Sequence, residues 1–220
     1  STRSLAASAR RLRLPRRLLS TEAAESAAPA PSSKIVVCQD GEVASVQLSN
    51  APVNSLTLEV CEELVAALRS LEAEPSVRGV LLGSALPSVF SAGLDITEMH
   101  EPDPERLRSF WRTLQEVWLK LSTSRVATIA AIEGHSPAGG CMLALSCDWR
   151  VMSLTDGGAD GRPLTIGLNE TKLGIVAPFW FADTMAYVVG SRQTDLLLQT
   201  GALLTTEQAL AVGLVDEAVL

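Results

Sequence analysis

The 220-residue sequence is poor in the residues from which metal centres and His-based catalytic triads are built. It contains two histidines and four cysteines, and the cysteines show neither a Cys-x-x-Cys pair nor metal-ligand spacing. No apolar run approaches the roughly 20 residues that are needed to cross a bilayer. No G-x-G-x-x-G motif follows a predicted strand, so a dinucleotide-binding fold has no fingerprint here. We therefore expect buried thiols, no metal site and no integral membrane segment.

Acidic residues are absent from the first 21 positions, which hold six arginines among Ser, Ala and Leu. This composition is typical of a mitochondrial transit peptide, and it predicts import into the matrix. A basic arm that binds nucleic acid or a membrane is the alternative, but no aromatic residues interleave with the arginines. We assign residues 1–33 to a transit peptide and linker, and residues 34–220 to one folded catalytic domain.

The charge of the chain apart from its arginine-rich segment argues against nucleic acid as a partner. The whole chain carries a formal charge of −7. Setting the six arginines aside leaves 12 bases against 25 acids, a formal charge of −13. A strongly acidic domain repels nucleic acid, so local dipoles and a few placed bases would have to hold any anionic ligand.

Hydrophobic periodicity predicts alternating strands and helices, which is an α/β architecture. Asp40-Gly41 between two apolar runs indicates a hairpin. Asp95 followed by Glu98 indicates a helix cap. The predicted strands are 34–38, 43–48, 77–82, 126–132, 149–154 and 163–168, and the predicted helices are 58–71, 107–121, 141–147, 193–204 and 206–212. Residues 133–137 are predicted to form a loop.

Two glycine-containing junctions stand where a predicted strand passes into a helix. They are Ala92-Gly93-Leu94 and Ala138-Gly139-Gly140. Glycine at the mouth of a helix lets a ligand approach bare backbone, and free N–H groups there favour negative charge. Close packing of helix against strand is the alternative role for either junction taken alone.

Five segments in register make the chain similar to the crotonase (enoyl-CoA hydratase/isomerase) superfamily. The resemblance covers roughly residues 34–220, and any one segment alone would be weak. The segments are Pro52-Val53-Asn54-Ser55-Leu56, Val89-Phe90-Ser91-Ala92-Gly93-Leu94-Asp95, Pro137-Ala138-Gly139-Gly140-Cys141, Gly167-Leu168-Asn169-Glu170-Thr171 and Ala177-Pro178-Phe179-Trp180.

The resemblance implies a spiral of ββα units that binds an acyl-CoA thioester, usually as a homotrimer, without a separate cofactor. It implies that the backbone N–H groups of Leu94 and Gly139 receive the thioester oxygen, that Glu170 is the acid/base, and that Asn169 lies beside the substrate. The CoA and acyl path would be lined by Ala92, Gly93, Leu94, Asp95 and Ile96. Two departures are a longer 156–162 loop and an end at Leu220, before the C-terminal helices of the family.

The chemistry favours isomerisation of a 3-enoyl-CoA over hydration. One carboxylate in a dry pocket can move a proton from C2 to C4, while two N–H donors hold the dienolate oxygen. Hydratases of the family carry a second glutamate three residues after the oxyanion-hole glycine, and Met142 stands there. The alternatives are a hydratase or acyl-CoA hydrolase, a serine hydrolase that uses His135 with Ser88 or Ser91, and a non-catalytic acyl-CoA-binding protein.

Overall fold

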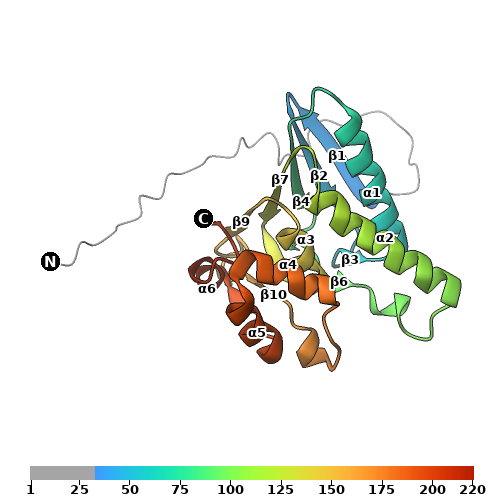
Figure 1. The fold of residues 1–220 in the computed structure, drawn as a ribbon. Helices are drawn as coiled ribbons and strands as arrows, with labels where there is room; N and C mark the ends of the chain where they lie inside the picture. Colours follow the sequence, from blue (N-terminus) through green and yellow to red (C-terminus); the bar gives the residue numbers. More distant parts are fainter. Residues whose placement is uncertain (1–32) are drawn as a thin grey trace.

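The computed structural model describes residues 33–220, so the predicted transit segment lies outside the described residues except for Ser33. A six-stranded sheet runs in the order β1-β2-β4-β7-β9-β12 (Figure 1). Its strands are β1 Ile35–Asp40, β2 Val43–Leu48, β4 Gly79–Ser84, β7 Ala127–Ile132, β9 Trp149–Ser153 and β12 Glu217–Val219.

The register of this sheet accounts for one small error of the sequence prediction. β1 and β2 form the predicted hairpin, with Asp40 opposite Val43, and every other neighbouring pair is parallel. The strand predicted at 77–82 begins two residues later, because Val43 pairs with Gly79 and Leu48 with Ser84. Parallel strands place their carboxyl ends at one edge of the sheet, and ligand-binding loops commonly start there.

Two amphipathic helices, α1 (Leu58–Ala73) and α2 (Pro104–Ser122), pack side by side (Figure 1). Each begins at a side-chain cap: Thr57 accepts the N–H of Val60, and Asp103 accepts that of Arg106. The predicted apolar faces are buried, and they consist of Val60, Cys61, Leu64, Val65, Leu68 and Leu71 in α1 and Phe110, Leu114, Val117 and Leu121 in α2.

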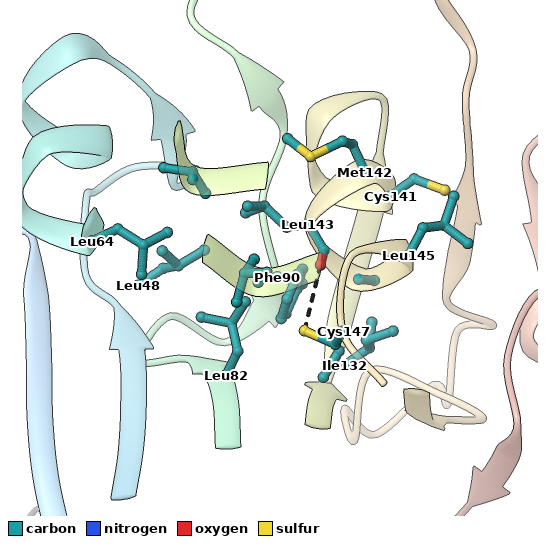
Figure 2. Close-up of a cluster of buried hydrophobic side chains, with 14 of the residues drawn as sticks. Leu48, Leu64, Leu82, Phe90, Ile132, Cys141, Met142, Leu143, Leu145 and Cys147 are labelled. Atoms are coloured by element: carbon teal, nitrogen blue, oxygen red, sulfur yellow. Dashed lines mark hydrogen bonds between the residues drawn. The ribbon is translucent and has the colours of Figure 1, made fainter. Parts of the chain in front are cut away.

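The short helix α3 (Gly139–Leu145) lies in the middle of the core, and all seven of its residues are buried. Figure 2 shows α3 beside Phe90, which is fully buried, and Ile132, the last residue of β7. A helix that is apolar on every side must be covered on every side. The first turn of α3 is therefore held by the core rather than by solvent-exposed loops.

Two smaller sheets connect this helix to the rest of the chain. One has the order β11-β10-β8-β5, and the other pairs β3 with β6. Their strands are β11 Leu204–Thr205, β10 Thr165–Gly167, β8 Gly134–Pro137, β5 Ser88–Val89, β3 Ser55–Leu56 and β6 Gly93–Leu94. The prediction of a loop at 133–137 is wrong, because β8 pairs in parallel with both β5 and β10.

The C-terminal part differs most from the predicted elements. Helix α4 (Phe179–Val189) is absent from the sequence prediction, and α5 (Ser191–Thr200) ends before the predicted residue 204 because Gly201 adopts a left-handed conformation. Helix α6 (Thr206–Ala211) follows a capping box at Thr205. None of the helices in residues 33–220 combines the length and apolar character that crossing a membrane requires.

Candidate active site

The first glycine junction turns the backbone N–H of Leu94 away from its own sheet. Strand β6 pairs with β3, and the N–H of Asp95 donates to Leu56 O at 3.1 Å. Because successive N–H groups of a strand point to opposite sides, the N–H of Leu94 faces away from β3. Gly93 has φ +96°, and a Cβ there would lie 2.9 Å from Gly139 N. Glycine at this position lets the two junctions meet.

The second junction places Gly139 as the first residue of α3. Ala138 before it has φ 49° and ψ −120°, an uncommon conformation for a non-glycine residue, and its N–H donates to Gly167 O at 2.8 Å. The first hydrogen bond of the helix runs from the N–H of Met142 to Ala138 O at 3.0 Å. The N–H of Gly139 lies before this bond and therefore has no partner within the helix. A Cβ on Gly139 would lie 3.2 Å from Leu94 N. The structure thus brings together the two backbone groups that the sequence singled out.

Glu170 enters the same region from the strand next to β8. Gly167, the last residue of β10, pairs with Pro137, so both chains leave the sheet at the same end. Three residues after the end of β10, Glu170 begins the short 3-10 helix η3 (Glu170–Leu173). Burial and, less strongly, the negative charge of Glu170 raise the pKa of the Cys141 thiol in the first turn of α3.

One oxygen of the Glu170 carboxylate, Oε2, is buried without a hydrogen-bond donor in the described part of the chain. Glu170 as a whole is 5% exposed. Burial raises the pKa of Glu170, while a hydrogen bond from its own backbone N–H lowers it in part. The neighbouring Asn169 Oδ1 is likewise buried and unpartnered within the described part. Two free acceptors at one place can bind a substrate or receive a proton.

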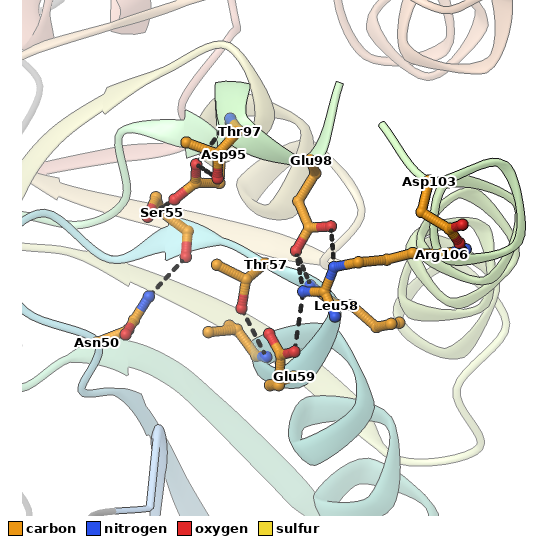
Figure 3. Close-up of polar contacts among 11 residues, drawn as sticks. Asn50, Ser55, Thr57, Leu58, Glu59, Asp95, Thr97, Glu98, Asp103 and Arg106 are labelled. Atoms are coloured by element: carbon orange, nitrogen blue, oxygen red, sulfur yellow. Dashed lines mark hydrogen bonds and ion pairs between the residues drawn. The ribbon is translucent and has the colours of Figure 1, made fainter. Parts of the chain in front are cut away.

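The segment after Leu94 is held by the polar contacts that Figure 3 shows. Asp95 accepts the hydroxyl of Ser55 at 2.8 Å, and it caps the 3-10 helix η2 (Ile96–Glu98) by accepting the N–H of Thr97. Both carboxylate oxygens of Asp95 are therefore engaged in holding this turn.

Glu98 has a different role from the one the capping pattern predicted. Its carboxylate is 4% exposed and accepts the N–H of Leu58, the first residue of α1, at 3.0 Å. It also forms an ion pair with Arg106 of α2 at 2.6 Å (Figure 3). Glu98 therefore ties η2 to both helices, which a local sequence pattern could not indicate.

The arrangement does not support a Ser-His pair. Strands β5 and β8 place Val89 opposite His135, but the ring Nδ1 of His135 accepts the N–H of Thr165 at 3.2 Å. The hydroxyl of Ser91 donates to Asn54 O at 2.7 Å. Among the described residues, neither Ser88 nor Ser91 forms a hydrogen bond with the ring of His135.

Met142 and three of the four cysteines belong to the core, whereas Cys38 on the edge strand β1 is exposed, so the expectation of buried thiols is wrong for that residue. Met142 is fully buried on α3, and its sulfur lies 3.5 Å from the hydroxyl of Ser146. Burial raises the pKa of Cys61 and of Cys147 to about 12, so both are thiols at neutral pH. Residues 33–220 contain no group of three or more His, Cys, Asp or Glu side chains that could hold a metal ion.

A cavity of about 780 Å³ lies at the opposite end of α3 from Gly139. Its wall includes Cys147, Arg150 and Asp216. Arg150 forms an ion pair with Asp216 at 2.6 Å and donates to Cys147 O at 2.8 Å. This cavity is separate from the glycine junctions, so it is not the candidate active site.

Comparisons with known proteins agree with this arrangement. The enoyl-CoA hydratase/isomerase family matches residues 39–220. Mouse mitochondrial enoyl-CoA delta isomerase 1 is 46% identical over 217 residues, which cover 97% of this chain and 73% of the relative. The human counterpart is 48% identical over 177 residues, which cover 80% and 57%. The chain thus spans between about half and three quarters of the length of these curated relatives.

Solved structures confirm the predicted fold. The human mitochondrial delta3-delta2-enoyl-CoA isomerase superposes with a TM-score of 0.80 at 45% identity, covering 84% of this chain and 70% of that chain. The enoyl-CoA hydratase of Bacillus anthracis gives 0.74 at 27% identity, covering 84% and 70%. Because both its sequence and its fold match, the chain belongs to the enoyl-CoA hydratase/isomerase family.

Proposed function

We propose that the chain is an enoyl-CoA isomerase that converts 3-enoyl-CoA, cis or trans, into 2-trans-enoyl-CoA in the β-oxidation of unsaturated fatty acids. One observation carries the proposal: Gly139 packs closely against the backbone nitrogen of Leu94 just after β8, and β10, the strand paired with β8, leads at the same end of the sheet to Glu170, whose Oε2 is buried and unpartnered among the described residues. The relatives named enoyl-CoA delta isomerase support it at 46–48% identity.

The reaction needs one base and one oxyanion hole. Ionised Glu170 takes a proton from C2, and the electron pair moves through the thioester to give a dienolate with its charge on oxygen. The N–H groups of Leu94 and Gly139 stabilise that oxygen, each contributing roughly 2.7–4 kcal/mol by analogy with measured oxyanion holes. Protonated Glu170 then returns the proton to C4, so the enzyme ends in its initial state.

The surroundings of Glu170 suit a group that must accept and then release a proton. A carboxylate held by several donors would have a low pKa and would be a weak base. Oε2 of Glu170 has no such donor among the described residues, and burial raises its pKa toward the working range. Oδ1 of Asn169 provides a second acceptor for a polar group of the substrate.

The acyl-CoA path would run along residues 92–96. Ala92 is exposed and the Ile96 side chain is 73% exposed, while Gly93 is buried where the two junctions meet. The backbone of this segment would bind the thioester, and the exposed side chains would contact CoA or the acyl chain. Coenzyme A is part of the substrate, and we propose no separate cofactor.

Incubation with a 3-enoyl-CoA tests the proposal directly. The conjugated 2-enoyl product absorbs in the ultraviolet, and free CoA thiol and 3-hydroxyacyl-CoA are measured in the same samples. We expect the conjugated product to form without either of the others. Binding without conversion would favour an acyl-CoA-binding protein, and release of thiol would favour a hydrolase.

A hydratase is the competing activity, and Met142 argues against it. A thioether can neither deprotonate water nor orient it as a carboxylate does, and water placement requires positioned polar contacts. Met142 is also fully buried in the core. We expect little hydration of 2-enoyl-CoA, and more by the Met142→Glu variant if that variant folds. Equal rates of hydration and isomerisation in the parent would contradict the assignment.

We also propose that the full-length form is a homotrimer. The family resemblance implies a trimer, and exposed apolar side chains from η3 to α4 support a covered surface there. Val176 is 88% exposed, Phe179 74% and Tyr187 92%. Large apolar side chains that are exposed close together along the chain are consistent with an interface. Light scattering on the full-length protein should give three times the protomer mass, and a monomer would contradict the proposal.

The last part of the proposal concerns location. Residues 1–33 would direct the chain to the mitochondrial matrix, and residues 34–220 would form the catalytic domain. The mouse alignment covers 97% of this chain, so it includes most of the arginine-rich segment, and that relative is named mitochondrial. A reporter fused to residues 1–33 should enter the matrix. A diffuse cytosolic signal would contradict this part without affecting the proposed chemistry.

A further inference from the structure

A buried hydroxyl, that of Ser91, stands directly before the first glycine junction, Ala92-Gly93-Leu94. Ser91 is fully buried, and its Oγ accepts the N–H of Gly93 at 3.1 Å. The same hydroxyl donates to Asn54 O at 2.7 Å. Both hydrogen-bonding functions of the group are therefore used, one of them by the residue that directly precedes Leu94.

Asn54, whose carbonyl accepts the hydroxyl of Ser91, is itself held by several hydrogen bonds. Asn54 is fully buried with φ 52°. Its side-chain amide donates to Phe90 O at 3.1 Å and to the hydroxyl of Ser84 at 2.8 Å, and its Oδ1 accepts the N–H of Asn50. Asn54 is thus held by Asn50, just after β2, and by Ser84, the last residue of β4. The hydroxyl of Ser91 connects the carbonyl of this anchored residue to the N–H of Gly93.

Ser91 also contacts the second junction through its backbone. A Cβ on Gly140 would overlap the carbonyl oxygen of Ser91, so glycine alone allows the two chains to approach this closely. Ser91 therefore adjoins both residues that neighbour the oxyanion-hole donors: Gly93 before Leu94, and Gly140 after Gly139.

We propose that Ser91 is a positioning residue of the oxyanion hole, whose hydroxyl sets the distance and direction of the Leu94 N–H relative to that of Gly139. The proposal rests on the proposed function, in which these two groups bind the thioester oxygen. Ser91 itself does not touch the substrate. Its hydroxyl holds the peptide of Gly93, and the next peptide along the chain supplies the Leu94 donor.

Replacing Ser91 by alanine removes both hydrogen bonds and keeps the backbone. Misplacement of a catalytic group by about 1 Å can reduce a rate about 100-fold. We therefore expect kcat on 3-enoyl-CoA to fall about 10- to 100-fold in Ser91→Ala, with KM changed by less than about 3-fold, because the donor acts most strongly on the charged intermediate.

Ser146→Ala is the matched control. Ser146 is also a buried serine, 4% exposed, whose hydroxyl donates to a backbone carbonyl, Met142 O, at 2.7 Å. It lies at the C-terminal end of α3, away from the junctions. Both substitutions delete a buried hydroxyl, so a general loss of packing or stability would reduce kcat in both variants. We expect Ser146→Ala to retain kcat within about 2-fold.

A spectroscopic measurement reads the oxyanion hole without turnover. A saturated acyl-CoA labelled with ¹³C at the thioester carbonyl is bound to each protein, and the carbonyl stretch is recorded by infrared difference spectroscopy. Hydrogen bonds to the oxygen lower this frequency. We expect a lowered frequency in the parent and in Ser146→Ala, and a frequency returning toward the free value in Ser91→Ala. If the alanine variant does not fold, Ser91→Cys is measured in its place.

The outcomes separate this proposal from the proposed function. If the parent and the Ser91 variant both isomerise the substrate at similar rates and both lower the carbonyl frequency, the positioning role of Ser91 is wrong but the proposed function stands. Equal loss of kcat in the two alanine variants would overturn the positioning role as well. A parent that binds acyl-CoA without lowering the frequency would overturn both. Release of CoA thiol that depends on Ser91 would instead identify it as a nucleophile.

Discussion

The two turns that form the site are built in opposite ways. In the turn after Leu94, the buried Glu98 has three donors from two helices, and Asp95 is bonded on both oxygens. In the turn that starts at Glu170, the buried Oε2 has no donor within the described range. The side chain of Leu173, at the end of the second turn, is 62% exposed.

This difference matches two different chemical tasks. An oxyanion hole works because its donors are already in place when charge develops, so rigidity is useful there. A proton carrier must serve two carbon atoms, and a tightly bonded carboxylate would have too low a pKa to do so. In the proposed mechanism, the polar network around Glu98 would therefore support the oxyanion hole, and the lack of such a network around Glu170 would keep the base reactive.

The largest expected effect comes from removing the base. Glu170→Gln keeps the shape of the side chain but cannot accept the C2 proton, so we expect kcat to fall about 10²–10⁴-fold. Acyl-CoA binding, measured by calorimetry, should change little, because the glutamine retains a carbonyl oxygen. In the parent, kcat/KM should rise with pH to a plateau, with a midpoint above the ordinary glutamate pKa of about 4.3. Activity within a few-fold of the parent would exclude Glu170 as the base.

Crowding the hole should have the next largest effect. A Cβ on Gly139 would lie 3.1 Å from Leu94 Cδ2 and 3.2 Å from Leu94 N, so Gly139→Ala should push the two donors apart. Loss of one oxyanion donor costs about 10²–10³ in rate, and we expect a loss approaching that range. Gly79→Ala is the control, since its Cβ would meet nothing closer than 3.6 Å. Circular dichroism beside kinetics separates the two effects, and a matching loss of fold would favour a packing role for Gly139.

Breaking the network behind Leu94 should have a smaller effect on rate and a clear effect on stability. Glu98→Ala leaves the part-buried N–H of Leu58 without its acceptor, and loss of a hydrogen bond to a charged group costs about 1.5–3 kcal/mol in the free energy of unfolding. A loosened turn should also lower kcat about 3- to 10-fold. Glu59→Ala is the control, because Glu59 pairs with the same arginine at the surface and should stay within about 0.5 kcal/mol. Urea denaturation with steady-state kinetics tests both effects, and equal losses in the two variants would contradict the role of Glu98.

Particular residues show how far the sequence could predict this site. The glycine junctions could be identified because a strand-to-helix turn needs glycine chiefly where another group approaches the backbone closely, and the structure does bring Leu94 and Gly139 together. Strand β8 could not, because Gly-His-Ser-Pro has no β-branched or aromatic residue, and its pairing partners lie 30 or more positions away. The bonds of Glu98 to Leu58 and Arg106 depend on how α1 and α2 pack, which no local pattern encodes.

Helix α4 could not be predicted from the sequence for a different reason. It contains Trp180, Phe181 and Met185 as buried residues, but it is apolar on much of its surface, with Phe179 and Tyr187 exposed. A helix without a polar face has weak 3.6-residue periodicity, so the pattern on which a helix prediction depends is lost. The same exposed apolar side chains, Phe179 and Tyr187, are the ones on which the proposed trimer rests.

The smallest expected effect is on stability, and its sign follows from the buried, unpartnered Glu170. Its folded pKa is raised above the unfolded value of about 4.3, so between the two pKa values the native state binds more protons than the unfolded state. The free energy of unfolding therefore falls as pH rises through this window and is constant above it. Glu170→Gln does not titrate, so its Tm should match the parent near pH 4 and exceed it at pH 7.

The gain in Tm should be about 2–4 °C for each kcal/mol of relieved burial cost. Calorimetric scans of both proteins from pH 4 to pH 8 measure it. Asp95→Asn is a suitable comparison, because hydrogen bonds from Thr97 and Ser55 outweigh desolvation and lower the pKa of that carboxyl, so its ionised form stabilises the fold. The Asp95 variant should therefore lose stability at pH 7, where the Glu170 variant gains it. A Tm difference of the same sign in both variants, or one independent of pH for Glu170→Gln, would contradict the contrast between the two turns.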